Sequence, residues 1–250
     1  DCRGARIEDT TGAASRGILV AAPISTALAN VTVRNCVVAG FLNNVRVTRE
    51  GFKTLAEGAE YANAFADVVV ENSHLYASRG SGIFVDGYVT GVTLRDLDIA
   101  FSGGVGIYLE AGSKDNVVAR NTIRGNGFGD VVPEGVPFDL DGVEYRYLST
   151  TDNLIEGSSA GGIFLYKNCG EYATERPNQW WTRRYGADGN RVERNSFFSD
   201  RSGAQAVLVG TKSRTQFLLQ PVANTVIADN HALIPANAEP YRWIHGHTGT

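Results

Sequence analysis

The chain of 250 residues has no methionine, only three cysteines and four histidines, and little excess charge. No apolar run approaches the roughly 20 residues that a membrane-spanning helix needs. A net charge of −4 argues against bulk binding to nucleic acid or to an anionic membrane, because both need clustered positive charge. Since no initiator methionine is present, we expect a mature, processed or trimmed product. If the missing segment was a secretory signal, the location is secreted or periplasmic.

The cysteines do not form a metal-binding pattern such as CxxC. An odd number of cysteines allows at most one internal pair among Cys2, Cys36 and Cys169. Cys36 lies in an apolar strand pattern, so we expect it to be a small core residue. The sequence assigns no role to Cys2 or Cys169 and leaves the redox compartment open.

The histidines also give little indication of a metal site. His74 and His231 each lie just beyond a repeated asparagine, and we expect them in the core or between sheets. His245 and His247 lie in the segment 236–250, which we interpret as a C-terminal tail, and no third ligand accompanies their HxH spacing.

What the sequence does contain is a repeated pattern of alternating β-branched residues that closes on a charge and a polar residue. Internal repeats of this kind are typical of solenoids. The copies are NVTVRN 30–35, DVVVEN 67–72, GVTLRD 91–96, NVVARN 116–121 and NRVERN 190–195, with looser copies NLIEGS 153–158 and TVIADN 225–230. The closing residues are Asn35, Asn72, Asp96, Asn121, Ser158, Asn195 and Asn230.

A second pattern of short apolar segments follows most copies by about ten residues. These segments are rich in valine, isoleucine and aromatic residues, as strands are. They read GILVA 17–21, NVRVT 44–48, GIFVD 82–86, GIYLE 106–110, GIFLY 162–166 and AVLVG 206–210. Helical periodicity is almost absent, and only residues 52–65 are compatible with a short helix.

Stacked coils are the architecture that these repeats favour. One coil cannot bury its apolar side alone, whereas stacking pairs each strand with its copy about 4.8 Å away. Asparagine tolerates the left-handed bend between two sheets, and its amide can bond to a stacked copy. The alternative, an antiparallel sandwich, predicts hairpin turns and no asparagine column.

The repeats and the asparagine column resemble those of the pectin-lyase-like superfamily of right-handed parallel β-helix proteins, over about residues 5–235. This resemblance implies an all-β, single-stranded solenoid that forms one domain, 1–250, with long loop insertions on one face. It fixes no activity, because one fold carries many functions. The paired-aspartate and Gly-His-Gly motifs of polygalacturonase-like hydrolases and the Asp-Pro-His motif of mannuronan epimerases are missing.

Because alternate residues of a strand share a face, the residues of the second pattern point in turn toward the inside and the outside of the coil. We expect inward side chains at Ile83, Ile107, Ile163, Val85, Leu109 and Leu165. The outward column then reads Leu19, Arg46, Phe84, Tyr108 and Phe164, and its aromatic rings are candidates for stacking on sugars. A second outward column contains Thr48, Asp86, Glu110 and Tyr166, followed directly by Arg49 and Lys167.

Asp86 and Glu110 are expected one coil apart, with carboxyl groups about 5 Å from each other. Like charges that close together are unfavourable unless a proton or a cation is shared. The pair is therefore an acid and nucleophile for retaining glycoside hydrolysis, or it holds a shared Ca²⁺. A third interpretation is two solvated surface acids, each bonded to a nearby arginine.

Long segments leave the coil after these strands and are expected to wall a cleft. They span 49–66, 128–152 and 166–189, and the last contains Trp180, Trp181, Arg183 and Arg184. Each tryptophan either stacks on a sugar or packs the loop onto the coil. Functional residues concentrate on such loops when a rigid scaffold holds them.

These residues lead to the hypothesis of a carbohydrate-active enzyme whose partner is an acidic polysaccharide or oligosaccharide. Lyases of the resembled superfamily pair acidic Ca²⁺ ligands, here Asp86 and Glu110, with a basic residue, here Lys167. In a lyase or C5-epimerase, Tyr166 or Lys167 would be the base, and Arg183 or Arg184 would neutralise the uronate. The alternatives are a glycoside hydrolase that uses the Asp86–Glu110 pair and a non-catalytic polysaccharide-binding module.

Overall fold

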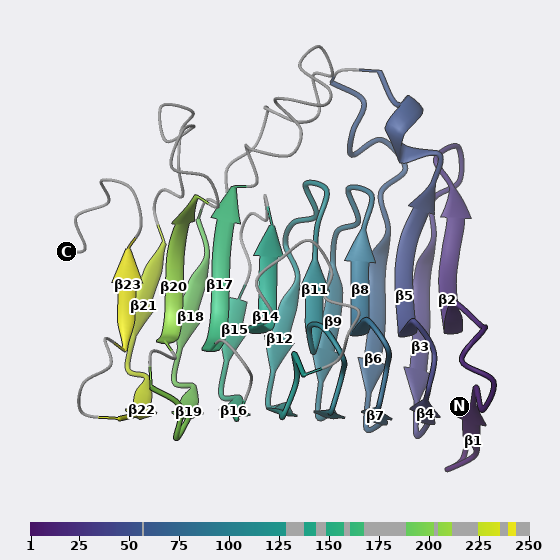
Figure 1. The fold of residues 1–250 in the computed structure, drawn as a ribbon. Coiled ribbons are helices and arrows are strands. Elements are labelled where there is room, and N and C mark those ends of the chain that lie inside the picture. Colours follow the sequence, from purple (N-terminus) through teal and green to yellow (C-terminus); the bar gives the residue numbers. More distant parts are fainter. Residues whose placement is uncertain are drawn as a thin grey trace.

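The computed structural model describes residues 1–56, 58–128, 138–143, 149–157, 161–167, 189–202, 205–211, 225–235 and 240–243. These residues form a right-handed parallel β-helix in which three parallel sheets run along one axis (Figure 1). Each coil contributes one short strand to each sheet, and every strand pairs with its copies in neighbouring coils. The predicted fold class is therefore confirmed. Among the described residues, no helix is long and apolar enough to cross a membrane.

Sheet B contains the second sequence pattern. Its strands are β2 (Arg16–Pro23), β5 (Asn43–Glu50), β8 (Ser81–Asp86), β11 (Ile107–Leu109), β14 (Phe138–Val143), β17 (Gly161–Lys167), β20 (Gln205–Thr211) and β23 (Tyr241–Trp243). The predicted segment 128–152 is therefore not a simple insertion, because it contains β14 of sheet B and the next strand, Ser149–Thr151, of sheet C. Likewise, β23 lies within the expected tail, 236–250, and pairs with β20.

Sheet C contains the first pattern. Its strands are β3 (Ala29–Arg34), β6 (Ala66–Glu71), β9 (Val92–Arg95), β12 (Val117–Ala119), β15 (Ser149–Thr151), β18 (Arg191–Glu193) and β21 (Val226–Ala228). Sheet A follows sheet C in each coil and was not recognised in the sequence. Its strands are β1 (Arg6–Glu8), β4 (Val37–Ala39), β7 (His74–Tyr76), β10 (Asp98–Ala100), β13 (Thr122–Arg124), β16 (Leu154–Glu156), β19 (Ser196–Phe198) and β22 (His231–Leu233).

The core is a stack of branched apolar side chains inside the coils. All the residues predicted to point inward from sheet B, such as Ile83, Ile107 and Leu165, are fully buried. They pack against inward residues of the other two sheets, such as Leu94 and Ile99. At about 25 cal/mol per Å², this continuous burial is the main force that holds the coils together.

The corner between sheets C and A has two adjacent columns that the sequence analysis merged into one. The first residue of each corner is left-handed, with φ of 58° at Asn35, 46° at Asn72, 55° at Asp96 and 57° at Asp152. The next residue points inside, where Asn121, Asn153, Asn195 and Asn230 form an amide ladder. Ser158 was therefore assigned wrongly, and Asn153 is the true member of the interior column.

The interior ladder satisfies backbone groups as well as amides. Asn153 donates from Nδ2 to the Val118 carbonyl at 3.0 Å and to Asn195 Oδ1 at 2.8 Å. Its Oδ1 accepts from the backbone nitrogen of Asn121 at 2.9 Å and from the Asn121 amide at 3.0 Å. Buried polar groups need such partners, so asparagine is favoured at each corner.

Two expectations about single residues, His74 and His231, need correction, whereas the expectation for Cys36 is confirmed. Cys36 is buried in the core as expected, but it is bonded to Cys2 in a disulfide with a Cα–Cα distance of 4.9 Å. His74 is not a core residue, because its side chain is 41% exposed and its Nδ1 lies 2.8 Å from Asp98 Oδ2. His231 occupies the same outward column and is exposed. Between 52 and 65, the described helix is only the 3₁₀ turn Phe52–Thr54.

Candidate active site on sheet B

The outer face of sheet B brings the predicted column into register. The Cα partners run from Leu19 to Arg46, then to Phe84 and Tyr108. Two rungs further on, Phe164 occupies the same column. Asp141, which the sequence analysis placed in an insertion, is the intervening member and pairs with both Tyr108 and Phe164. The alternation in FDLDGV, 138–143, was the signal that could have revealed it.

The aromatic rings of this column are not a solvent-facing strip. Tyr108 is only 7% exposed and Phe164 only 1% exposed. The rings of Phe84 and Tyr108 stack on each other with centroids 5.0 Å apart and planes 15° apart. The guanidinium of Arg46 lies over Phe84, with Cζ 5.0 Å from the ring centroid. Arg46, Phe84 and Tyr108 thus form a continuous stack that holds the guanidinium in place.

Asp86 is the buried acid beside this stack. Its Oδ2 accepts a hydrogen bond from Arg46 Nη2 at 2.7 Å, and the residue is only 3% exposed. Its other oxygen, Oδ1, is buried and has no hydrogen-bond partner in the described part of the chain. The same is true of Arg46 Nε. The interpretation as an acid bonded to a nearby arginine therefore holds for Asp86, although the residue is buried and not solvated.

Glu110 lies one rung from Asp86, as the coil spacing predicted. Val85 and Leu109 are Cα partners, and the Glu110 backbone nitrogen continues the ladder by donating to the Val85 carbonyl at 2.9 Å. Glu110 is half-buried, so it is the more accessible acid of the two. Tyr166 is in the same column but two rungs further on, because Val143 intervenes.

The connection between β5 and β6 lies against the turns that follow both acids. Phe52 meets Tyr88 edge to face at 6.2 Å, and Tyr61 meets the same ring at 5.7 Å. Tyr61 also donates from its hydroxyl to the Gly112 carbonyl at 2.6 Å. Since Tyr88 is two residues after Asp86 and Gly112 is two after Glu110, this connection flanks the acids as expected. It is visible in blue above β5 in Figure 1.

Arg49 holds this connection in place. Its side chain is fully buried, and its guanidinium donates to the carbonyls of Glu60, Ala62 and Ile24. Burial lowers the pKa of Arg49 from its ordinary value. A buried cation is tolerated here because backbone dipoles surround it. From the sequence, Arg49 was recognised only as the residue after Thr48, and this anchoring role was not predicted.

The remaining predicted site residues are only partly described. The backbones of Tyr166 and Lys167 belong to β17, which pairs with β20. Trp180, Trp181, Arg183 and Arg184 lie outside the described residues.

The described residues do not fit a calcium site. Calcium takes six to eight oxygen ligands, and no group of three or more acidic, histidine or cysteine side chains gathers in the part of the chain that the structure describes. Asp86 Oδ1 is an available oxygen, but the Arg46 cation already balances the charge of Asp86. A Ca²⁺ ion held by Asp86 and Glu110 stays a prediction.

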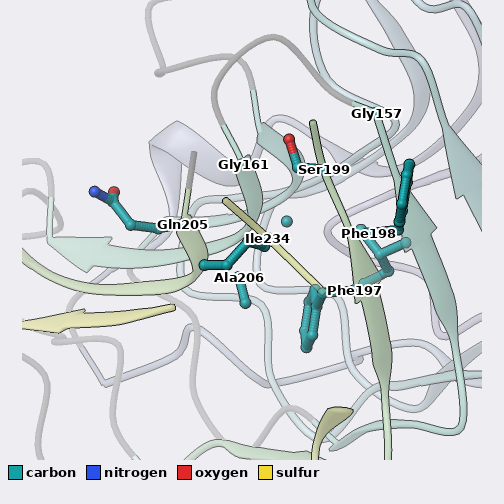
Figure 2. Close-up of a pocket in the computed structure, with 10 residues that line it drawn as sticks. Gly157, Gly161, Phe197, Phe198, Ser199, Gln205, Ala206 and Ile234 are labelled. Atoms are coloured by element: carbon teal, nitrogen blue, oxygen red, sulfur yellow. The ribbon is translucent and has the colours of Figure 1, made fainter. Parts of the chain in front are cut away.

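A small hollow lies at the turn from sheet A to sheet B, beside Phe197, Phe198 and Ile234 (Figure 2). Ser199 and Gln205 contribute the polar groups at this hollow. Its empty volume is about 220 Å³, including the part open to solvent. The space in it that a solvent molecule can occupy is about 10 Å³, room for about one water and not for a sugar. The outer face of sheet B therefore remains the candidate site.

Comparison with known proteins identifies the family. A family model described as "Right handed beta helix region" matches residues 16–177. The chain belongs to this right-handed β-helix family. Comparison with curated proteins gives no match.

Solved structures with the same fold include the A-module of the mannuronan C-5 epimerase AlgE4 from Azotobacter vinelandii, at 14% identity and a TM-score of 0.58. That alignment covers 95% of this chain and 57% of the epimerase module. The periplasmic alginate epimerase AlgG aligns at 11% identity with a TM-score of 0.54, covering 86% of this chain and 42% of AlgG.

The enzymatically active domain of tailspike protein 2 from bacteriophage CBA120 aligns at 9% identity with a TM-score of 0.53, covering 96% of this chain and 37% of the tailspike domain. The chain thus spans roughly half the length of these structures or less. At such low identity, the likeness establishes the fold alone.

Proposed function

We propose that this protein is an enzyme that acts on an acidic polysaccharide by abstracting the proton at carbon 5 of a uronate, as a lyase or a C5-epimerase. The observation that carries the proposal is the buried Arg46–Asp86 pair next to the more accessible Glu110 on the outer face of sheet B. The names of two structures with the same fold, both epimerases of alginate or mannuronan, support the same class of substrate.

In the proposed reaction, Tyr166 or Lys167 takes the C5 proton, and Arg183 or Arg184 neutralises the uronate carboxylate. Asp86 and Glu110 orient the sugar. Elimination follows if the bond from C4 to the glycosidic oxygen then breaks and the departing oxygen takes up a proton. Epimerisation follows if a proton returns to C5 from the opposite face.

A second candidate is glycoside hydrolysis by Asp86 and Glu110. Their position on adjacent rungs favours it, because retaining hydrolases need carboxyl groups about 5 Å apart. The bond from Arg46 to Asp86 weighs against it, since it occupies one oxygen of the nucleophile or acid.

The Cys2–Cys36 disulfide supports a secreted or periplasmic location. Disulfides persist in oxidising compartments and are rare in the cytosol. Such a location would expose the protein to extracellular or envelope polysaccharides.

The proposal is tested by incubating the whole chain in D₂O with alginate, pectate or a glycosaminoglycan, with and without added Ca²⁺. Epimerisation predicts deuterium at C5 by NMR, whereas elimination predicts the absorbance of an unsaturated uronate that carries no hydrogen at C5. New reducing ends without deuterium or unsaturation would instead establish hydrolysis. No product from any polymer would contradict both reactions.

We predict that Glu110→Gln lowers the rate of this reaction by about 100-fold, because Glu110 orients the sugar and a small misplacement of a bound substrate can cost that much. Glu156→Gln is the matched control, since Glu156 lies on sheet A and is likewise half-buried. The rate is measured at saturating substrate, as deuterium incorporated at C5 for epimerisation or as unsaturated uronate formed for elimination. Equal rates for the two variants would remove Glu110 from the site.

A further inference from the structure

The Arg46–Asp86 pair is incompletely bonded, although both residues are charged. One hydrogen bond joins Arg46 Nη2 to Asp86 Oδ2, while the donor Arg46 Nε and the acceptor Asp86 Oδ1 are both buried without partners among the described residues. A buried charged group that lacks a hydrogen bond destabilises the folded protein. Native proteins contain few such groups, so this pair calls for a physical explanation.

The two unpartnered atoms set opposite requirements for a ligand. Arg46 Nε–H needs an acceptor, and Asp86 Oδ1 needs a donor. A carboxylate, phosphate or sulfate would satisfy Arg46 but repel Asp86. A metal ion would satisfy Asp86 but repel the guanidinium. A hydroxyl group carries both a lone pair and a hydrogen, and it is neutral.

The setting of the pair matches a sugar-binding position. Arg46 is the more exposed member, with 21% of its side chain open to solvent against 5% for Asp86, so a ligand approaches from the guanidinium side and must displace what covers Arg46 Nε and Asp86 Oδ1. The stack on Phe84 and Tyr108 fixes the plane of that guanidinium. Preorganised donors and acceptors of this kind discriminate strongly, because an analogue without the hydroxyl leaves them unpaired.

We propose that the Arg46–Asp86 pair is a specificity-determining subsite that binds a neutral hydroxyl of a sugar unit, and binds neither its carboxylate nor a cation. This inference rests on the proposed function for the class of ligand. It adds that the Arg46–Asp86 pair binds a hydroxyl, while other residues neutralise the uronate carboxylate.

The test is glycan binding by the whole chain, measured by calorimetry with alginate, pectate and neutral galactan oligosaccharides at several salt concentrations. The variants are Asp86→Asn and the neutral double variant R46Q/D86N, which leaves no uncompensated buried charge. Asp98→Asn and R124Q/D98N are the matched controls, because Arg124 and Asp98 form an ion pair on sheet A. Near-ultraviolet circular dichroism checks that the Phe84–Tyr108 stack persists.

Hydroxyl recognition predicts that both site variants raise Kd about tenfold, the equivalent of one lost charged hydrogen bond. The dependence of Kd on salt should stay as in the parent, since no charge on the ligand is contacted. The sheet A controls should bind as the parent does.

Three results would overturn the inference. A weaker salt dependence in R46Q/D86N would mean that Arg46 contacts the carboxylate. Tighter binding of acidic oligosaccharides by Asp86→Asn would mean that Asp86 repels the ligand, and an unchanged Kd would mean a structural pair. Binding of neutral galactan alone, lost in Asp86→Asn, would support the subsite while contradicting an acidic substrate. If no glycan bound to the parent, both proposals would fail.

Discussion

Two sets of arginine–aspartate pairs in this molecule are built differently. At the corner between sheets C and A, Arg120 donates from Nε and Nη2 to the two oxygens of Asp96 at 2.8 and 2.6 Å. Arg194 binds Asp152 in the same two-pronged way, with both distances at 2.9 Å. On the outer face of sheet B, Arg46 makes a single bond to Asp86.

Burial alone would predict the opposite distribution of hydrogen bonds, with the buried pair more completely bonded than the exposed pairs. The corner pairs are exposed, so water could complete their bonding, yet both carboxylate oxygens are satisfied. The Asp86 side chain is 5% exposed, so it cannot rely on water, yet one oxygen is unpaired. The coil geometry permits two-pronged pairs repeatedly. The fold therefore does not prevent a second hydrogen bond between Arg46 and Asp86, and its absence is a local property of sheet B.

Removing the cation from each kind of pair is the strongest way to test this contrast. Arg46→Met should lower the free energy of unfolding by about 3–5 kcal/mol, because it leaves the Asp86 carboxylate buried without a counter-charge. Arg120→Met should cost far less, since water can solvate the exposed Asp96. Denaturant unfolding of both variants measures the difference. Similar losses would mean that the two pairs contribute alike and that burial of Asp86 has no special consequence.

The corner itself offers a second comparison, between its exposed and interior columns. Asn153→Ala should lower the free energy of unfolding by about 3 kcal/mol, because it removes partners from the Val118 carbonyl and from the Asn121 and Asn195 amides. Asp152→Asn changes the adjacent left-handed residue, and asparagine adopts that conformation readily. Because Asp152→Asn removes only the charge of an exposed ion pair with Arg194, we expect a small loss in the same denaturant series. A smaller loss for Asn153→Ala than for Asp152→Asn would contradict the assignment of the interior ladder.

Strand direction and spacing were predictable from the sequence because they depend on a period of two and on copies of similar length. The outward column of Arg46, Phe84 and Tyr108 followed from that alternation, as did the adjacency of Asp86 and Glu110. The coil that contains β14 and β15 was not predicted, since β14 shares only the alternation and β15 has serine and threonine where β12 has valine and alanine. The corner register slipped by one residue because charged residues such as Arg120 occupy the left-handed position as well as asparagine.

The properties of the site were harder to predict than its members. Alternation gives the face on which a side chain lies, but it does not give what covers that side chain. Tyr108 and Phe164 were therefore expected to be open to solvent, whereas both are buried. The bond from Arg46 to Asp86 runs diagonally, between residues two positions apart on adjacent strands, and sequence spacing does not show in which direction a side chain leans. The Cys2–Cys36 disulfide likewise depends on β1 lying beside β4.

The smallest expected effect is the pH dependence of the corner pairs. The hydrogen bond from Arg120 holds the pKa of Asp96 below its ordinary value of 3.8, and Arg194 does the same for Asp152. A carboxyl whose pKa is lower in the folded state stabilises the protein fully above its unfolded pKa, and this contribution disappears as the pH falls through the folded value. Arg120→Gln should therefore be less stable than the parent above a pH of about 4, and the gap should close in more acidic buffer. Unfolding of the two proteins in parallel across this range measures the gap, and added salt should narrow it above that pH because the pair is exposed. A gap that persisted in acid would show that Arg120 stabilises the corner by packing and not by its charge.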